Sequence, residues 1–175
     1  RVSRALDMVR QFSGDKRKAL VLSRNNFPTA AGLASSASGF AALVGAAAKA
    51  LGVAEDSRRL SEWARLGSGS AARSIFGGYV DMAHGILEDG SDSVATPLYG
   101  PGHWPLSVVI AITNEEQKKI ASTAGMDHTM QTSPFYPAWV DGAEADLAQA
   151  RQAIERRDFQ QLAEVSEWSC MKMHA

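Results

Sequence analysis

The sequence predicts a mixed α+β fold, and three observations lead to that prediction. Short apolar or β-branched runs that favour strands occur at three places, whereas longer segments repeat apolar residues at helical spacing. The two kinds of segment do not alternate regularly, which argues against a parallel sheet built from βαβ units. Turns rich in glycine and proline separate them. The 175 residues suffice for one domain with a sizeable core, or for one and a half smaller domains.

The first half of the chain is predicted to run strand, turn, helix, helix. KALVLS at residues 18–23 fits a buried strand and leads into the small-residue loop PTAAGLASSASG at residues 28–39. A helix is expected next, with Gly52 as its C-terminal cap, because apolar residues recur at helical spacing. Those residues are Ala37, Phe40, Ala41, Val44, Ala47, Ala48 and Leu51. A second helix is expected from Asp56 to Leu66, followed by a second small-residue turn, GSGSAARS at residues 67–74.

Two more strands and two long helices are expected in the second half. GGYVDMA at residues 77–83 and PLSVVIAIT at residues 105–113 have strand-like composition, and the connection between them is rich in glycine and proline. We therefore expect one domain over residues 1–100 and the start of another over residues 101–175. Beyond Pro134, apolar residues recur at helical spacing in two segments. They are Val140, Ala143, Leu147, Ala150 and Ile154 in the first segment, and Phe159, Leu162 and Val165 in the second.

Composition argues against several functional classes. The net charge is −1 without a long basic tract, so nucleic acid is not an expected partner. A single cysteine, Cys170, permits no intramolecular disulfide and favours a reducing, cytoplasmic location. The longest apolar run, at residues 40–48, is too short to span a bilayer, and no membrane association is expected. The oligomeric state is left open, with a homodimer as one option.

The loop at residues 28–39 is suited to binding an anion. A glycine turn that enters a helix presents backbone N–H groups at the positive end of the helix dipole, and small side chains let a phosphate reach them. The hydroxyls of Ser35 and Ser36 can add hydrogen bonds to phosphate oxygens, or one of them can ligate magnesium. The alternative is that Ser35 caps the helix and the alanines serve packing. The loop matches neither the P-loop nor the dinucleotide fingerprint nor the nucleophile elbow.

Four segments in order carry a family resemblance. NNFPTAAGLASSASGFAAL (residues 25–43) resembles the P-x-x-x-G-L-x-S-S-A phosphate loop of the GHMP kinase superfamily, as found in mevalonate diphosphate decarboxylases. ARLGSGSAARSIFGGYV (64–80), EEQKKIASTAGMDHTMQTSPFY (115–136) and KMHA (172–175) resemble later segments of that family. The resemblance implies the two-lobed GHMP-kinase-like fold, with an N-terminal part related to the second domain of ribosomal protein S5.

The resemblance also implies ATP and Mg²⁺ as cofactors and mevalonate 5-diphosphate as the substrate, decarboxylated to isopentenyl diphosphate in isoprenoid biosynthesis. The residues expected at the ATP phosphates are Gly32, Leu33, Ala34, Ser35 and Ser36, with Ser36 as the candidate Mg²⁺ ligand. The residues expected at the substrate are Ser68, Ser70, Arg73, Ser122 and Thr123. Without the resemblance, Arg73 would fit a surface salt bridge, and the segment with Ser122 and Thr123 would fit an ordinary turn.

No carboxylate in the sequence takes the place of the family's catalytic aspartate, which is expected beyond Ala175. Asp81 and Asp127 lie near matched segments but not where the family has that residue. The chain is therefore expected to be a portion of a decarboxylase that is inactive alone. Two alternatives stay open: another GHMP enzyme, namely a mevalonate or phosphomevalonate kinase or a phosphomevalonate decarboxylase, and a non-catalytic anion-binding module.

Overall fold

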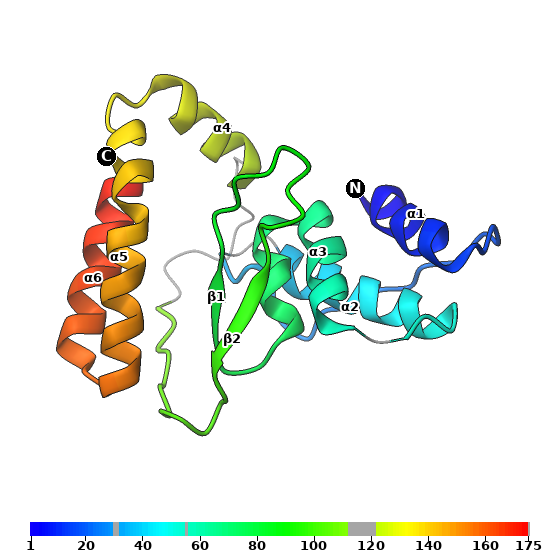
Figure 1. Cartoon of the computed structure of the whole chain (residues 1–175), viewed down its shortest axis with the longest axis horizontal. Coiled ribbons are helices and arrows are strands. Elements are labelled where there is room, and N and C mark those ends of the chain that lie inside the picture. Colours follow the sequence, from blue (N-terminus) through cyan, green and yellow to red (C-terminus); the bar gives the residue numbers. More distant parts are fainter. Residues whose placement is uncertain (30–31, 55, 112–121, 175) are drawn as a thin grey trace. The chain divides into compact units, whose positions relative to one another are not determined.

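The computed structural model describes residues 1–29, 32–54, 56–111 and 122–174, and the chain divides into two compact units, Arg1–Lys118 and Lys119–Ala175. Figure 1 follows its elements, which are α1 (Val2–Ser13), α2 (Ser35–Ala50), α3 (Ser57–Gly67), the 3₁₀ helix η1 (Gly69–Ile75), β1 (Tyr79–Met82), β2 (Ala95–Tyr99), α4 (Ser122–Thr132), α5 (Tyr136–Arg156) and α6 (Phe159–His174). Helices thus occur together with an antiparallel pair of strands. This confirms the predicted α+β class.

The core of the first unit forms where α1, α2 and α3 pack against one another and against η1. Val9 of α1 and Val44 of α2 are fully buried, and Trp63 of α3 is nearly so. The inner face of α2 carries alanines, among them Ala41 and Ala48, so that its neighbours approach its backbone closely. Burying a larger side chain such as Val9, Val44 or Trp63 contributes about 1.5–3 kcal/mol to the stability of the folded state. The core therefore fixes α2 and α3, the two helices that border the predicted phosphate loop.

The helices predicted from periodicity are confirmed. Helix α2 ends where Gly52 adopts a left-handed conformation, with φ of 65°. The Gly52 N–H donates to the carbonyl of Lys49 at 3.3 Å, as expected for a residue that closes a helix. Asp56 caps α3, since its carboxylate accepts the N–H of Arg58 at 3.0 Å. Helices α5 and α6 lie where the second half of the sequence places them, whereas α1 and α4 were not predicted.

The two strands form an antiparallel hairpin. Strand β1 lies within the predicted strand 77–83, but β2 was not predicted. In the connection between them, the Asp92 carboxylate accepts the backbone N–H groups of Ile86 at 2.6 Å and Leu87 at 3.2 Å. The hydrogen bond from Ile86, followed by that from Leu87, lowers the pKa of Asp92. The hairpin is tied to α3 because Arg65 donates to the carbonyl of Gly90 at 2.7 Å.

Two predicted strands are wrong over the residues that the structure describes. Residues 18–23 have no regular secondary structure, and Leu20 and Leu22 are 85% and 86% exposed. Residues 105–111 are also irregular, and Val109 is 93% exposed, while 112 and 113 lie outside the described residues. A strand needs a neighbouring backbone to pair with, and in the described part of the chain only β1 and β2 pair. The apolar composition of a segment does not reveal whether a neighbouring backbone is available for pairing.

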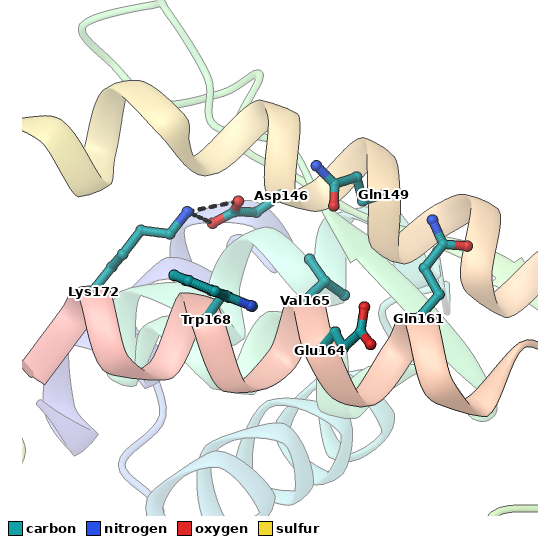
Figure 2. Close-up of a pocket in the computed structure, with 7 residues that line it drawn as sticks. All are labelled: Asp146, Gln149, Gln161, Glu164, Val165, Trp168 and Lys172. Atoms are coloured by element: carbon teal, nitrogen blue, oxygen red, sulfur yellow. Dashed lines mark hydrogen bonds and ion pairs between the residues drawn. The ribbon is translucent and has the colours of Figure 1, made fainter.

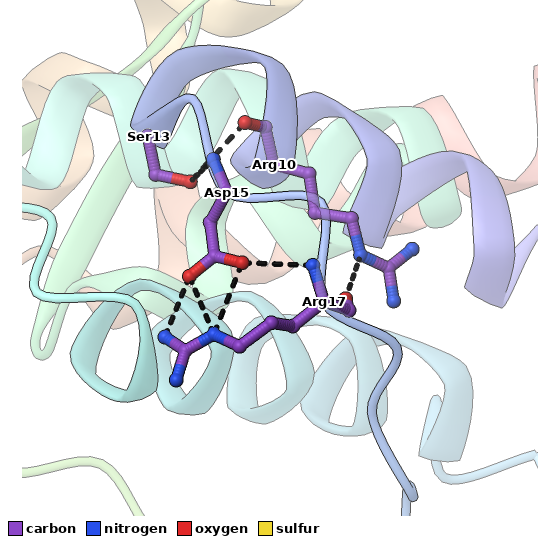
Figure 3. Close-up of polar contacts among 4 residues, drawn as sticks. All are labelled: Arg10, Ser13, Asp15 and Arg17. Atoms are coloured by element: carbon purple, nitrogen blue, oxygen red, sulfur yellow. Dashed lines mark hydrogen bonds and ion pairs between the residues drawn. The ribbon is translucent and has the colours of Figure 1, made fainter.

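A network of polar contacts closes the end of α1 (Figure 3). The Asp15 carboxylate accepts the Arg17 backbone N–H at 2.8 Å and its guanidinium at 2.5–3.1 Å. Arg10 donates from Nε to the Arg17 carbonyl at 3.0 Å, and the Ser13 hydroxyl donates to the Arg10 carbonyl at 3.1 Å. The side-chain hydrogen bond from Arg17 is the largest of the causes that lower the pKa of Asp15. These contacts satisfy charged groups within the turn itself.

The second unit contains α4 and the pair α5 and α6, which lie side by side. Arg157 and Asp158 connect the pair, and Arg157 has a left-handed conformation with φ of 56°. Lys172 of α6 donates to both carboxylate oxygens of Asp146 in α5, at 2.8 and 2.7 Å. Within the described ranges, no helix combines the length and the apolar character needed to cross a membrane.

Candidate functional site

Three hydroxyl groups meet at the start of α2. Ser36 in the first turn of α2 and Ser68, which connects α3 to η1, have their Oγ atoms 3.2 Å apart, although 32 residues separate them. The Oγ atoms of Ser68 and Ser70 are 3.4 Å apart. The structure thus brings together one residue expected at ATP and two expected at the substrate. We call Ser36, Ser68 and Ser70 the hydroxyl cluster.

The loop before α2 has the backbone shape that an exposed helix start needs. Gly32 has φ of 86° and Ala34 has φ of 51°, so both adopt conformations in the left-handed region. Ala34 occupies the N-cap position and provides no side-chain cap, which rules out Ser35 as the capping residue. A non-glycine residue in this region costs about 1–2 kcal/mol. The loop nevertheless keeps this shape, and in the described part of the loop the N-cap residue Ala34 offers no side-chain hydrogen bond to the helix start, where backbone N–H groups favour an anion.

The hydroxyl cluster depends on close packing between α2 and α3. A Cβ added to Gly67, the last residue of α3, would overlap the ring of Phe40 in α2. Phe40 lies one turn beyond Ser36, and Ser68 directly follows Gly67, so this contact sets how closely the two serines approach. Only glycine fits there without displacement of the ring. Sequence reasoning missed this role, because a glycine at a helix end reads simply as a helix stop.

Arg73 lies in the last turn of η1, the element that also carries Ser70. Its side chain is exposed, and within the residues described here its guanidinium makes no hydrogen bond or ion pair. The surface salt bridge considered for Arg73 from its sequence context is therefore not formed by the described residues. A planar guanidinium with free donors is suited to a carboxylate or phosphate group.

Ser122 and Thr123 begin α4 and belong to the second unit. The helix shows that this segment is not an ordinary turn. Thr123 is exposed at a helix start, where the dipole favours anions. The relation of these two residues to the hydroxyl cluster stays a prediction.

Two cavities lie away from the predicted site. One, of about 270 Å³, lies between α5 and α6, and Figure 2 shows Trp168 and the ion pair of Asp146 with Lys172 at its wall. The other, of about 220 Å³, borders α1 and α2 and is lined by Arg10 and Arg17 among others. Neither contains a predicted site residue. In the described portion, no group of three or more His, Cys, Asp or Glu side chains could hold a metal ion.

The arrangement of these elements is that of solved proteins with the GHMP-kinase fold, which defines the class of protein. A model of the diphosphomevalonate decarboxylase-like N-terminal domain matches residues 1–95. A model of the mevalonate 5-diphosphate decarboxylase C-terminal domain matches residues 108–175. The chain belongs to the diphosphomevalonate decarboxylase family, as the sequence motifs predicted.

Individual relatives agree with this assignment. A diphosphomevalonate decarboxylase of Ganoderma lucidum is 46% identical over 157 residues, which cover 89% of this chain and 39% of the fungal protein. A solved mevalonate diphosphate decarboxylase of Staphylococcus aureus has a TM-score of 0.84 at 39% identity, covering 99% of this chain and 52% of that one. Another structure, named as MDDEF in complex with MVAPP, AMPPCP and magnesium, has a TM-score of 0.81 at 40% identity, with coverage of 99% and 53%. The chain spans about 40% of the length of the curated relatives that it matches.

Proposed function

We propose that this chain carries the phosphate-binding loop and part of the substrate site of an ATP-dependent mevalonate 5-diphosphate decarboxylase. In the proposed reaction, ATP phosphorylates the tertiary 3-hydroxyl of mevalonate 5-diphosphate. Loss of that phosphate together with carbon dioxide then gives isopentenyl diphosphate, ADP and inorganic phosphate. The electron pair of the breaking bond to the carboxylate forms the alkene as the tertiary phosphate departs. Family membership supports this reaction, and so does the relative named as a complex with MVAPP and an ATP analogue.

The observation that carries the proposal is the hydroxyl cluster at the start of α2. Ser36 and Ser68 come from segments expected at different ligands, yet their Oγ atoms lie 3.2 Å apart. Phosphoryl transfer from ATP to the bound substrate brings two anionic molecules close together. Hydroxyl donors beside a helix start can stabilise the negative charge of both. In this proposal, Gly32, Leu33 and Ala34 offer their backbone to the phosphates beside the hydroxyl cluster. Ser35 offers a hydroxyl in addition to that of Ser36. These four loop residues, with Ser36, form the proposed ATP phosphate site.

Arg73 is the proposed anchor of the substrate's anionic groups. Its exposed guanidinium has no ionic partner within the described residues and projects from the same 3₁₀ helix as Ser70. Two parallel N–H donors can hold one diphosphate or carboxylate group in a fixed orientation. Ser68 and Ser70 donate to the same ligand in this arrangement. Ser122 and Thr123 are proposed to contact the substrate diphosphate from the start of α4.

The residues present fit magnesium as a partner of the phosphates. Mg²⁺ commonly keeps several waters and binds one or two protein oxygens together with substrate phosphates. Ser36 offers such an oxygen at the phosphate loop, and its hydroxyl retains a lone pair while it contacts Ser68. We propose Ser36 as this ligand. The bound ion would supply positive charge to the transferred phosphate.

Three further properties of the whole protein are proposed. The domain division at residues 100 and 101 is proposed because the matched models end at 95 and begin at 108. A cytoplasmic location is proposed because the single cysteine, Cys170, is exposed and would persist as a free thiol in a reducing compartment. Homodimer formation stays a prediction, which sedimentation velocity would test.

The direct test incubates the purified complete gene product with ATP, Mg²⁺ and mevalonate 5-diphosphate, and measures ADP, carbon dioxide and isopentenyl diphosphate. We expect product in stoichiometry with ADP, and loss of turnover in the Ser35→Ala/Ser36→Ala double variant. Ser93→Ala, which removes a hydroxyl from the hairpin connection, serves as the matched control and should retain parent turnover. Phosphorylated product without carbon dioxide would indicate a kinase, and preference for the 5-monophosphate would indicate the other type of decarboxylase. Either result would overturn the proposal.

A further inference from the structure

Ser61 is a buried polar residue with a long-range hydrogen bond. It lies in the middle of α3 and is 0% exposed. Among the described residues, it is the polar residue that is buried together with the apolar core. Its hydroxyl donates to the carbonyl of Ala72 in η1, with an Oγ to O distance of 3.0 Å. Serine within a helix often bonds to a carbonyl of the preceding turn. Ser61 instead connects two different elements.

This hydrogen bond acts on the backbone from which Arg73 projects. The carbonyl of Ala72 and the N–H of Arg73 belong to the same planar peptide unit. A donor that holds the carbonyl therefore sets the direction in which the Arg73 Cα leaves the plane. Ala72 itself is 0% exposed, so the segment is pressed against the core while the Arg73 side chain remains outside.

The 3₁₀ geometry of η1 makes such an external bond important. Hydrogen bonds within a 3₁₀ helix have poorer geometry than those of an α-helix, and such segments shift easily. Alanine would favour the helical conformation of α3 more than serine does, so propensity does not explain the residue. The structure explains it through the carbonyl of Ala72. The sequence carried a signal of this role, since Ser61 interrupts the apolar residues Leu60 and Ala64 of α3 with a hydroxyl.

We propose that Ser61 is a positioning residue for Arg73, holding the peptide of Ala72 so that the guanidinium points consistently at the anionic substrate. The inference rests on the proposed function, in which Arg73 binds that substrate. Ser61 touches neither ligand nor reacting atoms in this role. Its effect passes through η1, and it concerns the substrate more than the nucleotide.

The test replaces Ser61 by Ala and by Cys in the complete gene product. We expect Ser61→Ala to lower kcat/KM for mevalonate 5-diphosphate on the order of tenfold, because small displacements of an orienting group reduce turnover strongly. The KM for ATP should stay near the parent value. Amide hydrogen exchange over residues 71–76 should accelerate by about tenfold, as expected for a loosened local segment. Ser61→Cys keeps a weaker donor of similar size and should fall between Ser and Ala in both measurements.

Two controls separate positioning from general destabilisation. Val9→Ala shortens a buried side chain of α1 and leaves a cavity in the core. It should lower Tm while leaving kcat/KM unchanged. Ser93→Ala removes a hydroxyl bonded to the Ala83 carbonyl at 3.1 Å in the hairpin, and should change neither kinetics nor exchange at 71–76. If Ser61→Ala does not fold, Ser61→Cys decides by the same criteria.

The outcomes distinguish the two proposals. If the parent forms no isopentenyl diphosphate, the proposed function fails, and the role assigned to Ser61 fails with it. If the parent is active and Ser61→Ala keeps both parental exchange at 71–76 and parental kcat/KM, only the positioning role is overturned. An equal rise in the KM for ATP and for the diphosphate would also overturn it, because the defect would then not be specific to Arg73.

Discussion

Arg17 and Arg73 both lie in short segments of the first unit, yet the structure uses their guanidinium groups in opposite ways. Arg17 is held by the Asp15 carboxylate through Nη2 at 2.5 Å and Nε at 2.8 Å. Arg73 is exposed and has no ionic partner within the part of the chain that is described. An arginine satisfied by a neighbour stabilises a turn, whereas an arginine without one remains available to a ligand. The difference separates a structural cation from a candidate binding cation.

The helix ends beside these arginines differ in the same sense. At the end of α1, Gly14 takes the left-handed conformation and the Ser13 hydroxyl bonds to the Arg10 carbonyl. At the start of α2, Ala34 adopts φ of 51° without any side-chain cap. One helix end is closed by its own side chains, whereas the N-cap residue of the other, which lies beside the hydroxyl cluster, makes no side-chain cap hydrogen bond. A positive φ at a non-glycine residue such as Ala34 costs stability, and strain of this kind is concentrated at binding sites in proteins generally.

The largest effect is expected from a substitution that preserves charge. Arg73→Lys keeps the positive charge but loses the planar pair of donors, so kcat/KM for mevalonate 5-diphosphate should fall about 100-fold. Arg17→Lys is the matched control and should leave the kinetics unchanged, because its partner is Asp15. Steady-state kinetics on both variants of the complete gene product checks this. Equal kinetics in the two variants would remove the distinction between the two arginines.

A smaller effect is expected at the contact that brings the hydroxyls together. Gly67→Ala places a methyl group in the ring of Phe40, and overpacking of this kind costs about 1–3 kcal/mol. The same displacement should separate Ser68 from Ser36 and lower turnover. Phe40→Leu in the same chain should relieve the overlap and restore part of both losses. Urea unfolding and kinetics of the single and double variants measure this coupling.

Gly45→Ala provides the control within α2. A Cβ at Gly45 meets no atom within 4 Å, and the residue lies in the helix interior. Alanine should therefore stabilise the protein by about 0.5–1 kcal/mol. Additive effects of Gly67→Ala and Phe40→Leu, with no recovery in the double variant, would show that the two residues do not set the site's geometry.

Local pattern predicted α2, α3, α5 and α6 but not α1 or α4, and of the three predicted strands only that at β1 formed in the described residues, for a physical reason. A helix forms its hydrogen bonds within one segment, so the apolar periodicity of α2, α3, α5 and α6 was sufficient. A strand depends on a partner that composition does not reveal, and residues 18–23 and 105–111 have none in the described residues. Strand β2, which contains Pro97, lies between the two predicted strands, where the sequence analysis placed a connection rich in glycine and proline. Proline is tolerated there because both strands of a two-stranded sheet are edges.

The site was predictable as a set of residues but not as an arrangement. The small-residue loop and the resemblance indicated Ser36, Ser68 and Ser70 individually. Their contact arises from packing between α2 and α3, through Gly67 and Phe40, across 32 residues of sequence. No local signal encodes that distance. The roles of Ser35, Ser122, Thr123 and Arg73 at bound ligands stay predictions, which the kinetic experiments described above test.

The smallest effect is expected in the turn around Asp15, which holds Arg17, the structural arginine in the comparison with Arg73. The pKa of Asp15 lies below its ordinary value near 3.8, first because of the side-chain hydrogen bond from Arg17 and then because of the Arg17 backbone N–H. A carboxylate with a lowered pKa in the folded state contributes stability above the unfolded-state pKa and loses it as the pH falls through the folded-state pKa. Asp15→Asn should therefore lower Tm slightly at pH 7, and the difference from the parent should shrink once the pH drops below about 3.8. Kinetics at pH 7 should stay parental, because Asp15 and Arg17 lie outside the proposed site. Thermal unfolding from neutral to acidic pH tests the idea, and a Tm difference that stays constant with pH would mean that the ionised pair does not hold this turn.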